Sequence, residues 1–341
     1  MRQALRWVQP LMMAAAAIFI GVWLAGQWPS LRVHTWRLSA GWLLLSALCM
    51  LASWAVEIAL WRALAATLGG RIAYLPAARI WFKSAIVRYV PGNIWQPLSM
   101  TLQAQQHGVR PEATVTSVAL YQGIILMAAA PIAALYFWTT GNWGLLTTFV
   151  GSYGWLLILL VLAPVALFLA SPNLLIVSLN WLLAMVRRPP VQAGLGRSVL
   201  ALLLVVAAFD WLLWGATFAA LTFGVATFSG AEMAALAPHL IVAYAIAYCV
   251  GFLSFITPSG FGVREGALYV LLATVMDPAV VTVAALAMRV WTMAGEVLMA
   301  TLAALTEPRR GRWVEGDAAA PVAAGAPGDP FAADVHHEAT P

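Results

Sequence analysis

Charge is scarce in this chain of 341 residues, of which only 9% are charged and 63% are hydrophobic. A soluble domain carries about 25% charged residues, so the composition excludes a soluble globular protein. The mean hydropathy of +0.87 agrees with this conclusion. The composition therefore predicts an integral membrane protein.

The motifs of soluble enzymes and metal proteins are also missing. No GxxxxGK[ST], HExxH, GxSxG or CxxC pattern occurs, which leaves no phosphate-binding loop for ATP and no recognisable zinc, hydrolase or redox site. The two cysteines, Cys49 and Cys249, each lie inside an apolar run and fit small buried side chains. His336 and His337 are expected to be solvated. We therefore expect no metal, no cofactor and no catalytic constellation.

Lysine is almost absent, since Lys83 is the single one and every other basic residue is arginine. Fifteen basic and seven acidic residues precede Thr306, whereas the residues after it are acidic overall. Arginines at loop ends follow the positive-inside rule and attract anionic lipid headgroups, so this basic balance does not indicate nucleic-acid binding.

Apolar runs near the 20 or so residues needed to cross a bilayer divide the chain. They predict an all-α polytopic membrane protein with about eight transmembrane helices, one or two of the helices being re-entrant or broken. We expect residues 1–306 to form the membrane domain and residues 307–341, rich in Ala, Pro, Gly and acids, to be a disordered cytoplasmic tail. The expected spans are 10–28, 40–66, 113–139, 150–171, 198–223, 233–256, 261–276 and 279–305.

Three segments depart from the ordinary pattern of a span. Residues 261–276 are short for a crossing, so a half-helix stays open as an alternative. Residues 75–106 mix charges with aromatic residues and end one run at Pro91, which predicts a re-entrant hairpin or a pair of short helices. Residues 172–190 end in two arginines and are expected to form an amphipathic helix in the cytoplasmic interface.

The basic residues also predict an orientation. Four clusters of basic residues lie on the cytoplasmic side of the membrane if the N-terminus is cytoplasmic. The loops at 140–149 and 224–232 then lie on the opposite side. Arg32 and Arg37 in the first outer loop are exceptions to this rule. We therefore expect cytoplasmic N- and C-termini if residues 261–276 cross the membrane, whereas a re-entrant 261–276 would place the C-terminus outside, against Arg309, Arg310 and Arg312.

Two stretches combine a helix break with charge. The first is Arg88-Tyr-Val-Pro91-Gly92-Asn93-Ile-Trp-Gln-Pro, and the second is Thr-Pro258-Ser-Gly260-Phe-Gly262-Val-Arg264-Glu265-Gly. Irregular backbone at membrane depth is tolerated only where it is buried in protein or lines a water-filled cavity. Interrupted segments in the two halves of a chain are typical of a transporter site. The candidate site residues in these stretches are Arg88, Pro91, Gly92, Asn93, Pro258, Gly260, Gly262, Arg264 and Glu265.

Further ionisable residues lie inside the apolar runs, where each uncompensated charge costs about 2.5–3.5 kcal/mol. Asp210 has no cation nearby in the sequence, so either a hydrogen bond to a neighbouring helix or a place in a cavity explains it. Arg289 and Glu296 are seven residues apart and share one face of a helix. Glu57 has Arg62 as a local partner. We add Asp210, Arg289 and Glu296 to the candidate site.

Arginine is the residue that best matches phosphate, because its guanidinium makes bidentate hydrogen bonds. Arg264 follows a glycine-rich break, and backbone N–H groups at a helix start also favour an anion. Arg264 and Glu265 are consecutive and point about 100° apart on a helix, so each is expected to need another partner. Tryptophan is unusually frequent, and we expect most of the 17 to be interfacial anchors, Trp95 included.

The two broken stretches resemble the signatures of the lysylphosphatidylglycerol synthase transmembrane-region family, also called the flippase-like domain family. Its members pair an R-Y-x-P-G element with a P-x-G-x-G-x-R-E element, which are matched here at Arg88–Gly92 and Pro258–Glu265. The resemblance covers most of residues 10–305. It implies a bacterial inner-membrane protein that moves a lipid between leaflets. In the best-known relatives the domain is fused to an aminoacyltransferase. The tail after residue 306 is too short for that domain, so synthase activity is not expected.

The resemblance and the charges together predict translocation of an anionic or sugar-bearing lipid from the inner to the outer leaflet. The expected partner is a membrane lipid: an anionic phospholipid, an aminoacyl lipid or a polyprenyl-linked glycan. We expect Arg264 and Arg88 to engage the phosphate, while Glu265, Asp210 and Glu296 line a polar cleft. Two alternatives stay open, an intramembrane lipid-modifying transferase and a non-catalytic subunit that recruits a glycosyltransferase or another lipid-synthesis enzyme.

Overall fold

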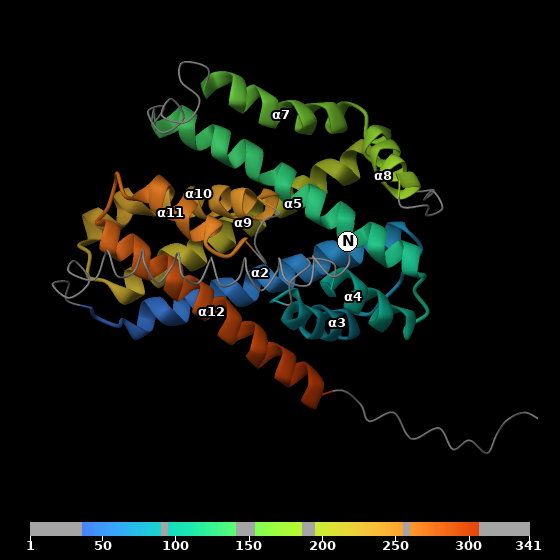
Figure 1. Cartoon of the computed structure of the whole chain (residues 1–341), viewed down its shortest axis with the longest axis horizontal. Coiled ribbons are helices and arrows are strands. Elements are labelled where there is room, and N and C mark those ends of the chain that lie inside the picture. Colours follow the sequence, from blue (N-terminus) through green and yellow to red (C-terminus); the bar gives the residue numbers. More distant parts are fainter. Residues whose placement is uncertain (1–35, 90–94, 141–153, 186–194, 255–259, 307–341) are drawn as a thin grey trace, which may run out of the picture. The chain divides into compact units, whose positions relative to one another are not determined.

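The computed structural model describes residues 36–89, 95–140, 154–185, 195–254 and 260–306, all within one compact unit that ends at Thr306. These residues are almost entirely helical and contain no strand, which confirms an all-α membrane protein (Figure 1). The expected span at 10–28 and the expected tail at 307–341 lie outside the described residues. The helices are α2 (Ala40–Thr67), α3 (Tyr74–Ile86), the short η1 (Val87–Tyr89), α4 (Trp95–Gln105), α5 (Pro111–Thr140), α7 (Gly154–Ala170), α8 (Asn173–Met185), α9 (Arg197–Val225), α10 (Gly230–Leu253), α11 (Val263–Leu272) and α12 (Pro278–Leu305).

Five of the described helices are long and apolar enough to cross a membrane, namely α2, α5, α9, α10 and α12. α7 and α8 are together long and apolar enough for a sixth crossing if they count as one broken span. The two helices meet at an angle of 110°. The sequence predicts a span followed by an interfacial helix at this place, and a re-entrant loop is the other arrangement that the bend allows.

The expected seventh span at 261–276 is not a crossing helix. α11 has only ten residues, and at about 1.5 Å per residue it reaches only half of the roughly 30 Å hydrocarbon core. Asp277 and Pro278 then start α12 at once, with the Asp277 carboxylate accepting a hydrogen bond of 2.7 Å from the Ala279 N–H. The half-helix alternative is therefore the correct one. Residues 75–106 form a pair of short helices as predicted, and these are α3 and α4.

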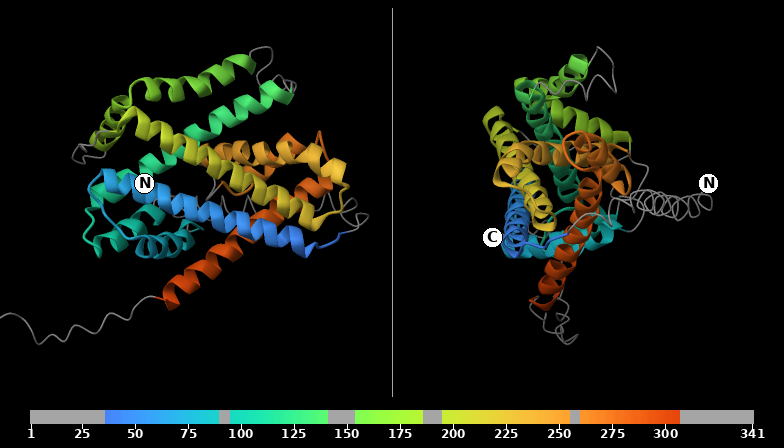
Figure 2. Two further views of the ribbon diagram at one scale, coloured as in Figure 1. Left: turned by 180° about the vertical axis from the view of Figure 1, so that it is seen from behind. Right: turned by 90° about the vertical axis from the view of Figure 1, so that its left-hand side faces the viewer.

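The two helices that pack most extensively against each other are α2 and α9, which run antiparallel (Figure 2). The Ser39 N–H donates to the Gly224 carbonyl at 2.9 Å, and the Ser46 hydroxyl donates to the Thr217 carbonyl at 2.9 Å. Small residues bring the neighbouring helices close as well. A Cβ on Gly215 would lie 2.6 Å from Cα of Ile241, so glycine lets α9 and α10 pack backbone against backbone.

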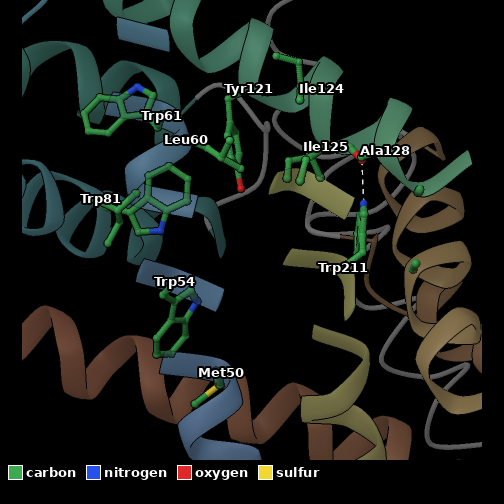
Figure 3. Close-up of a cluster of buried hydrophobic side chains, with 14 of the residues drawn as sticks. Met50, Trp54, Leu60, Trp61, Trp81, Tyr121, Ile124, Ile125, Ala128 and Trp211 are labelled. Atoms are coloured by element: carbon green, nitrogen blue, oxygen red, sulfur yellow. Dashed lines mark hydrogen bonds between the residues drawn. The ribbon is translucent and has the colours of Figure 1, made fainter. Parts of the chain in front are cut away.

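Large aromatic side chains fill the space between α2, α3, α5 and α9 (Figure 3). Trp61 is fully buried and donates from its indole nitrogen to the Ser117 hydroxyl at 3.0 Å. The Trp211 indole donates to the Ile125 carbonyl at 2.8 Å. Four tryptophans are exceptions to the expected role of interfacial anchor, since Trp54, Trp61, Trp81 and Trp211 belong to the core. Trp95 is exposed and keeps the anchor interpretation.

Candidate site: a charged cavity between the two broken elements

The second broken element begins with two glycines whose backbone only glycine adopts easily. Gly260 has φ of +67° and Gly262 has φ of +82°. A Cβ on Gly260 would also lie 2.9 Å from Cα of Gly251 on α10, so two backbones meet at this point. A Cβ on Gly251 would lie 3.1 Å from Cβ of Arg264. The glycines therefore hold the start of α11 directly against α10, with Arg264 beside it.

Glu265 ties this helix start to the rest of the protein. Its carboxylate accepts a hydrogen bond of 2.7 Å from the Gly262 N–H and another of 2.6 Å from Nε of Arg289 on α12. The side chain is almost completely buried, so both bonds are formed away from solvent. The backbone N–H of Gly262 already has an anionic partner inside the protein. One of the backbone donors at the start of α11 is therefore already bound to a carboxylate of the protein.

Arg264 points to the other side of α11 and meets aromatic rings. It donates a hydrogen bond to the hydroxyl of Tyr244, and its guanidinium lies 4.4 Å from the centroid of that ring and 5.8 Å from the centroid of the Tyr248 ring. Both contacts are favourable cation–π distances. No carboxylate of the described residues forms an ion pair with Arg264. The prediction that Arg264 and Glu265 have separate partners is confirmed.

The first broken element places Arg88 on the opposite side of the same space. Arg88 lies in η1, directly after α3, and its Nη2 is 2.5 Å from Oε1 of Glu296 on α12. Its Nε also donates to the Ala85 carbonyl at 3.3 Å. The α3–α4 pair that carries it is held by side chains, because Gln103 donates to the hydroxyls of Ser84 and Ser99 at 3.0 Å each.

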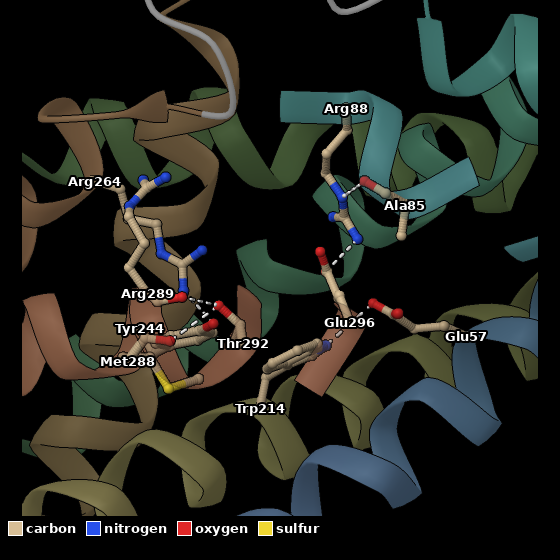
Figure 4. Close-up of polar contacts among 10 residues, drawn as sticks. All are labelled: Glu57, Ala85, Arg88, Trp214, Tyr244, Arg264, Met288, Arg289, Thr292 and Glu296. Atoms are coloured by element: carbon tan, nitrogen blue, oxygen red, sulfur yellow. Dashed lines mark hydrogen bonds and ion pairs between the residues drawn. The ribbon is translucent and has the colours of Figure 1, made fainter. Parts of the chain in front are cut away.

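One helix therefore partners both elements (Figure 4). Arg289 of α12 pairs with the second element and Glu296 of α12 pairs with the first. The two residues are seven positions apart, which is about two helical turns, so they share the face predicted for them. α12 is the physical link between two motifs that are far apart in the sequence.

Two further carboxylates come from α2 and α9. Asp210 is only 1% exposed, and its Oδ1 accepts a hydrogen bond of 2.5 Å from the Ser53 hydroxyl. Glu57 accepts a hydrogen bond of 3.1 Å from the Trp214 indole and is also hydrogen-bonded to Tyr121. The predicted local partner of Glu57, Arg62, instead donates to the Ile72 carbonyl at 2.9 Å. Both open explanations for Asp210 apply, since it has a hydrogen bond to a neighbouring helix and faces a cavity.

A cavity of about 170 Å³ lies between these groups. Its wall contains three arginines, three carboxylates, two amides and a set of aromatic rings. It is lined by Trp54, Glu57, Arg88, Gln96, Gln122, Ile125, Asp210, Trp211, Trp214, Tyr244, Tyr248, Gly251, Phe252, Gly260, Arg264, Arg289, Thr292 and Glu296.

The structure brings together six of the candidate site residues predicted from the sequence, namely Arg88, Asp210, Gly260, Arg264, Arg289 and Glu296. Glu265 and Gly262 do not line the cavity, because Glu265 is turned toward Arg289 and the start of its own helix. The other four, Pro91, Gly92, Asn93 and Pro258, lie outside the described residues.

Sequence reasoning missed the aromatic wall and its glycine. Tyr244 and Tyr248 are four residues apart and Gly251 follows one turn later, so the three share one face of α10. That spacing of two tyrosines inside an apolar run was the available signal. Among the residues that the structure describes, no group of three or more His, Cys, Asp or Glu is arranged to hold a metal ion.

The family model described as Lysylphosphatidylglycerol synthase TM region matches residues 11–299, which include both broken elements and α12. No curated protein matches the chain.

Proposed function

We propose a function from two facts: the chain belongs to the lysylphosphatidylglycerol synthase transmembrane-region family, and its helices enclose a charged cavity. The family suggests a function related to membrane lipids. Our proposal is that the protein translocates an anionic or sugar-bearing lipid from the inner to the outer leaflet of the bacterial inner membrane, with the lipid headgroup passing through the cavity.

The observation that supports this proposal is that the three arginines of the cavity differ in whether a carboxylate is paired with them. Arg88 and Arg289 each have a glutamate partner at about hydrogen-bonding distance, 2.5 and 2.6 Å. Arg264 has tyrosines instead, and a tyrosine ring does not neutralise its charge. A lipid phosphate is the kind of ligand that a guanidinium binds best, so Arg264 is the group that we expect to bind it.

The rest of the wall suits a polar headgroup of modest size. Pockets for drug-sized ligands measure about 300–1,000 Å³, and this cavity of about 170 Å³ is smaller. Gln96 and Gln122 add amide groups to the wall, and amides can hydrogen-bond to a hydroxyl or phosphate oxygen. The ring of Tyr248, which is only partly buried, adds an aromatic surface to the wall. We expect one headgroup unit to fit and a long oligosaccharide to stay outside.

Transport also requires that the headgroup leaves the cavity, and the two ion pairs of the cavity favour its release. If all three arginines were free, an anionic headgroup would bind too tightly to leave, because charge-assisted bonds in a low-dielectric cavity are strong. Glu296 and Glu265 neutralise two of the three arginines. The sequence contains no ATP-binding loop, so the driving force would come from a gradient, a partner protein or downhill lipid flux.

The test is a translocation assay with purified protein in liposomes. Fluorescently labelled phosphatidylglycerol is placed in the liposomes, and the accessibility of the label to a membrane-impermeant quencher reports exchange between leaflets. Wild-type protein should accelerate the exchange, Arg264→Ala should abolish the acceleration, and Arg71→Ala should behave as wild type because Arg71 is exposed and does not line the cavity.

Mass spectrometry of the same lipids separates transport from chemistry. A labelled lipid that crosses unchanged supports translocation, and a lipid of altered mass supports the transferase alternative. If Arg264→Ala exchanges lipid at the wild-type rate, the proposed site is wrong.

A further inference from the structure

The charges of the cavity do not balance. Two of its three arginines have carboxylate partners, Arg88 with Glu296 and Arg289 with Glu265. The charged groups of the wall that remain are Arg264, Glu57 and Asp210. With all groups ionised, these three leave one negative charge in a space enclosed by membrane helices. A buried uncompensated charge is costly, so this arrangement favours the uptake of a positive ion.

Asp210 is the group where that ion is needed most. It lies near the middle of α9, is 1% exposed and has a single hydrogen-bond donor, the Ser53 hydroxyl at 2.5 Å. No arginine or lysine of the described residues forms an ion pair with it. The charge that acts on Asp210 is that of Glu57, another acid, and like charges disfavour each other.

Glu57 is better placed to stay ionised. It accepts a hydrogen bond from the Trp214 indole, is hydrogen-bonded to Tyr121, and feels the positive charge of Arg88. The two acids are thus unequal: one has donors and a cation nearby, the other a single hydroxyl. The other charged and titratable groups around Asp210 and Glu57 are Arg88 on η1, Tyr121 on α5, Tyr244 and Tyr248 on α10, Arg264 on α11, and Arg289 and Glu296 on α12.

We propose that Asp210 and Glu57 form a proton-binding site of the headgroup cavity, in which the pair holds one proton, mainly on Asp210, when the cavity is empty. A protonated Asp210 carboxyl leaves Glu57 and Arg264 as opposite charges, so the cavity is neutral. The proton is taken from water and is released to water, and no other reactant is needed.

The same site links the headgroup to the proton, a consequence that rests on the proposed function. A phosphate bound at Arg264 adds one negative charge to the neutral cavity. That charge raises the affinity of Glu57 for a second proton, because the two negative charges now share one low-dielectric space. The linkage is reciprocal, so a lower pH favours binding of an anionic headgroup. A zwitterionic headgroup brings its own positive charge and should take up no proton.

The resting proton is tested without any ligand. Infrared difference spectroscopy of the purified protein in light and heavy water detects the carbonyl stretch of a protonated carboxyl. At neutral pH the wild type should show this band, Asp210→Asn should lose it, and Asp277→Asn should keep it, since Asp277 is an exposed helix cap on α12. Elution of each variant as a single peak in gel filtration checks that it is folded. A band that is absent from wild type, or one that persists in Asp210→Asn, overturns the proposal.

The linkage is tested by calorimetric titration of short-chain phosphatidylglycerol in two buffers of different ionisation enthalpy. The difference between the buffers gives the protons taken up on binding. We expect about one proton for wild type, and about none for short-chain phosphatidylethanolamine or for the double variant Glu57→Gln with Asp210→Asn, which has neither carboxyl of the site. Binding without proton uptake would contradict the linkage and leave the proposed function intact. Absence of phosphatidylglycerol binding, with the infrared band present, would instead contradict the proposed ligand class and leave the resting proton site intact.

Discussion

Each of the two broken elements places one arginine in the wall of the same cavity, but the two arginines have different partners. Arg88 in η1 is paired with a carboxylate of α12 at 2.5 Å, whereas Arg264 in α11 lies on two tyrosine rings of α10. The acid next to Arg264 in the sequence, Glu265, binds Arg289 instead. The comparison teaches that an arginine in a motif is not by itself a ligand site. What matters is whether the fold has already neutralised it.

The largest effect on stability is expected where the second element is tied down. Glu265→Gln removes the partner of Arg289, whose side chain is only 12% exposed, and breaking one side of a buried pair costs about 3–5 kcal/mol. The midpoint of thermal unfolding in detergent should fall strongly.

Glu296→Gln is the matched change in the first element and should be milder. Its partner Arg88 is 29% exposed and lines the cavity, so the pair is less completely buried and we expect a loss of about 1 kcal/mol. Equal losses for the two variants would show that the two elements are anchored alike, against the comparison drawn above.

The next effect separates the two glycines of the second element. Gly260→Ala adds backbone strain of about 1–2 kcal/mol and a Cβ that would lie 2.9 Å from Cα of Gly251, which adds about 1–3 kcal/mol of overpacking. Gly262→Ala meets nothing within 4 Å, so only the strain applies. Unfolding midpoints should therefore rank wild type above Gly262→Ala, and Gly262→Ala above Gly260→Ala. The reverse order of the two variants would mean that the close approach to α10 does not hold α11.

The smallest effect is expected at the tyrosines. Tyr244→Phe removes the hydroxyl that accepts from Arg264 and keeps the ring under the guanidinium. A hydrogen bond to a charged group contributes about 1.5–3 kcal/mol, and the retained ring offsets part of this loss. Lipid exchange in liposomes should fall about tenfold.

Tyr248→Phe keeps its ring at 5.8 Å from the guanidinium and should lower exchange by no more than about threefold. A larger loss for Tyr248→Phe than for Tyr244→Phe would mean that Arg264 is held mainly by the second ring.

The sequence predicts the helices and most of the charged wall for physical reasons that are local. Apolar runs near the thickness of a bilayer indicate spans, and Asp210, Arg289 and Glu296 are conspicuous because charge inside such runs is expensive. The sequence alone leaves the half-helix α11 open, because the apolar run at 261–276 is short for a crossing and long for a half-helix. The end of α11 at Leu272 and the start of α12 at Pro278 decide it.

The pairing of the charges could not be predicted, because it is decided by tertiary contacts. Arg88 and Glu296 are 208 residues apart, and Arg289 reaches across 24 residues to Glu265. The aromatic wall was missed for a different reason. A tryptophan or tyrosine inside an apolar run fits an interfacial anchor and a buried core equally well until the neighbouring helices are known.

The most direct test of the account measures binding of short-chain phosphatidylglycerol to two variants that each remove one cavity arginine. Arg264→Gln removes the cation without a carboxylate partner, and the double change Arg88→Gln with Glu296→Gln removes the paired cation together with its carboxylate. We predict that Arg264→Gln weakens binding by about 10–100-fold, as expected for loss of a bond between charged groups. The double variant should stay within about threefold of wild type. Strong binding in Arg264→Gln, together with loss of binding in the double variant, would contradict the claim that Arg264 is the arginine left free for the lipid.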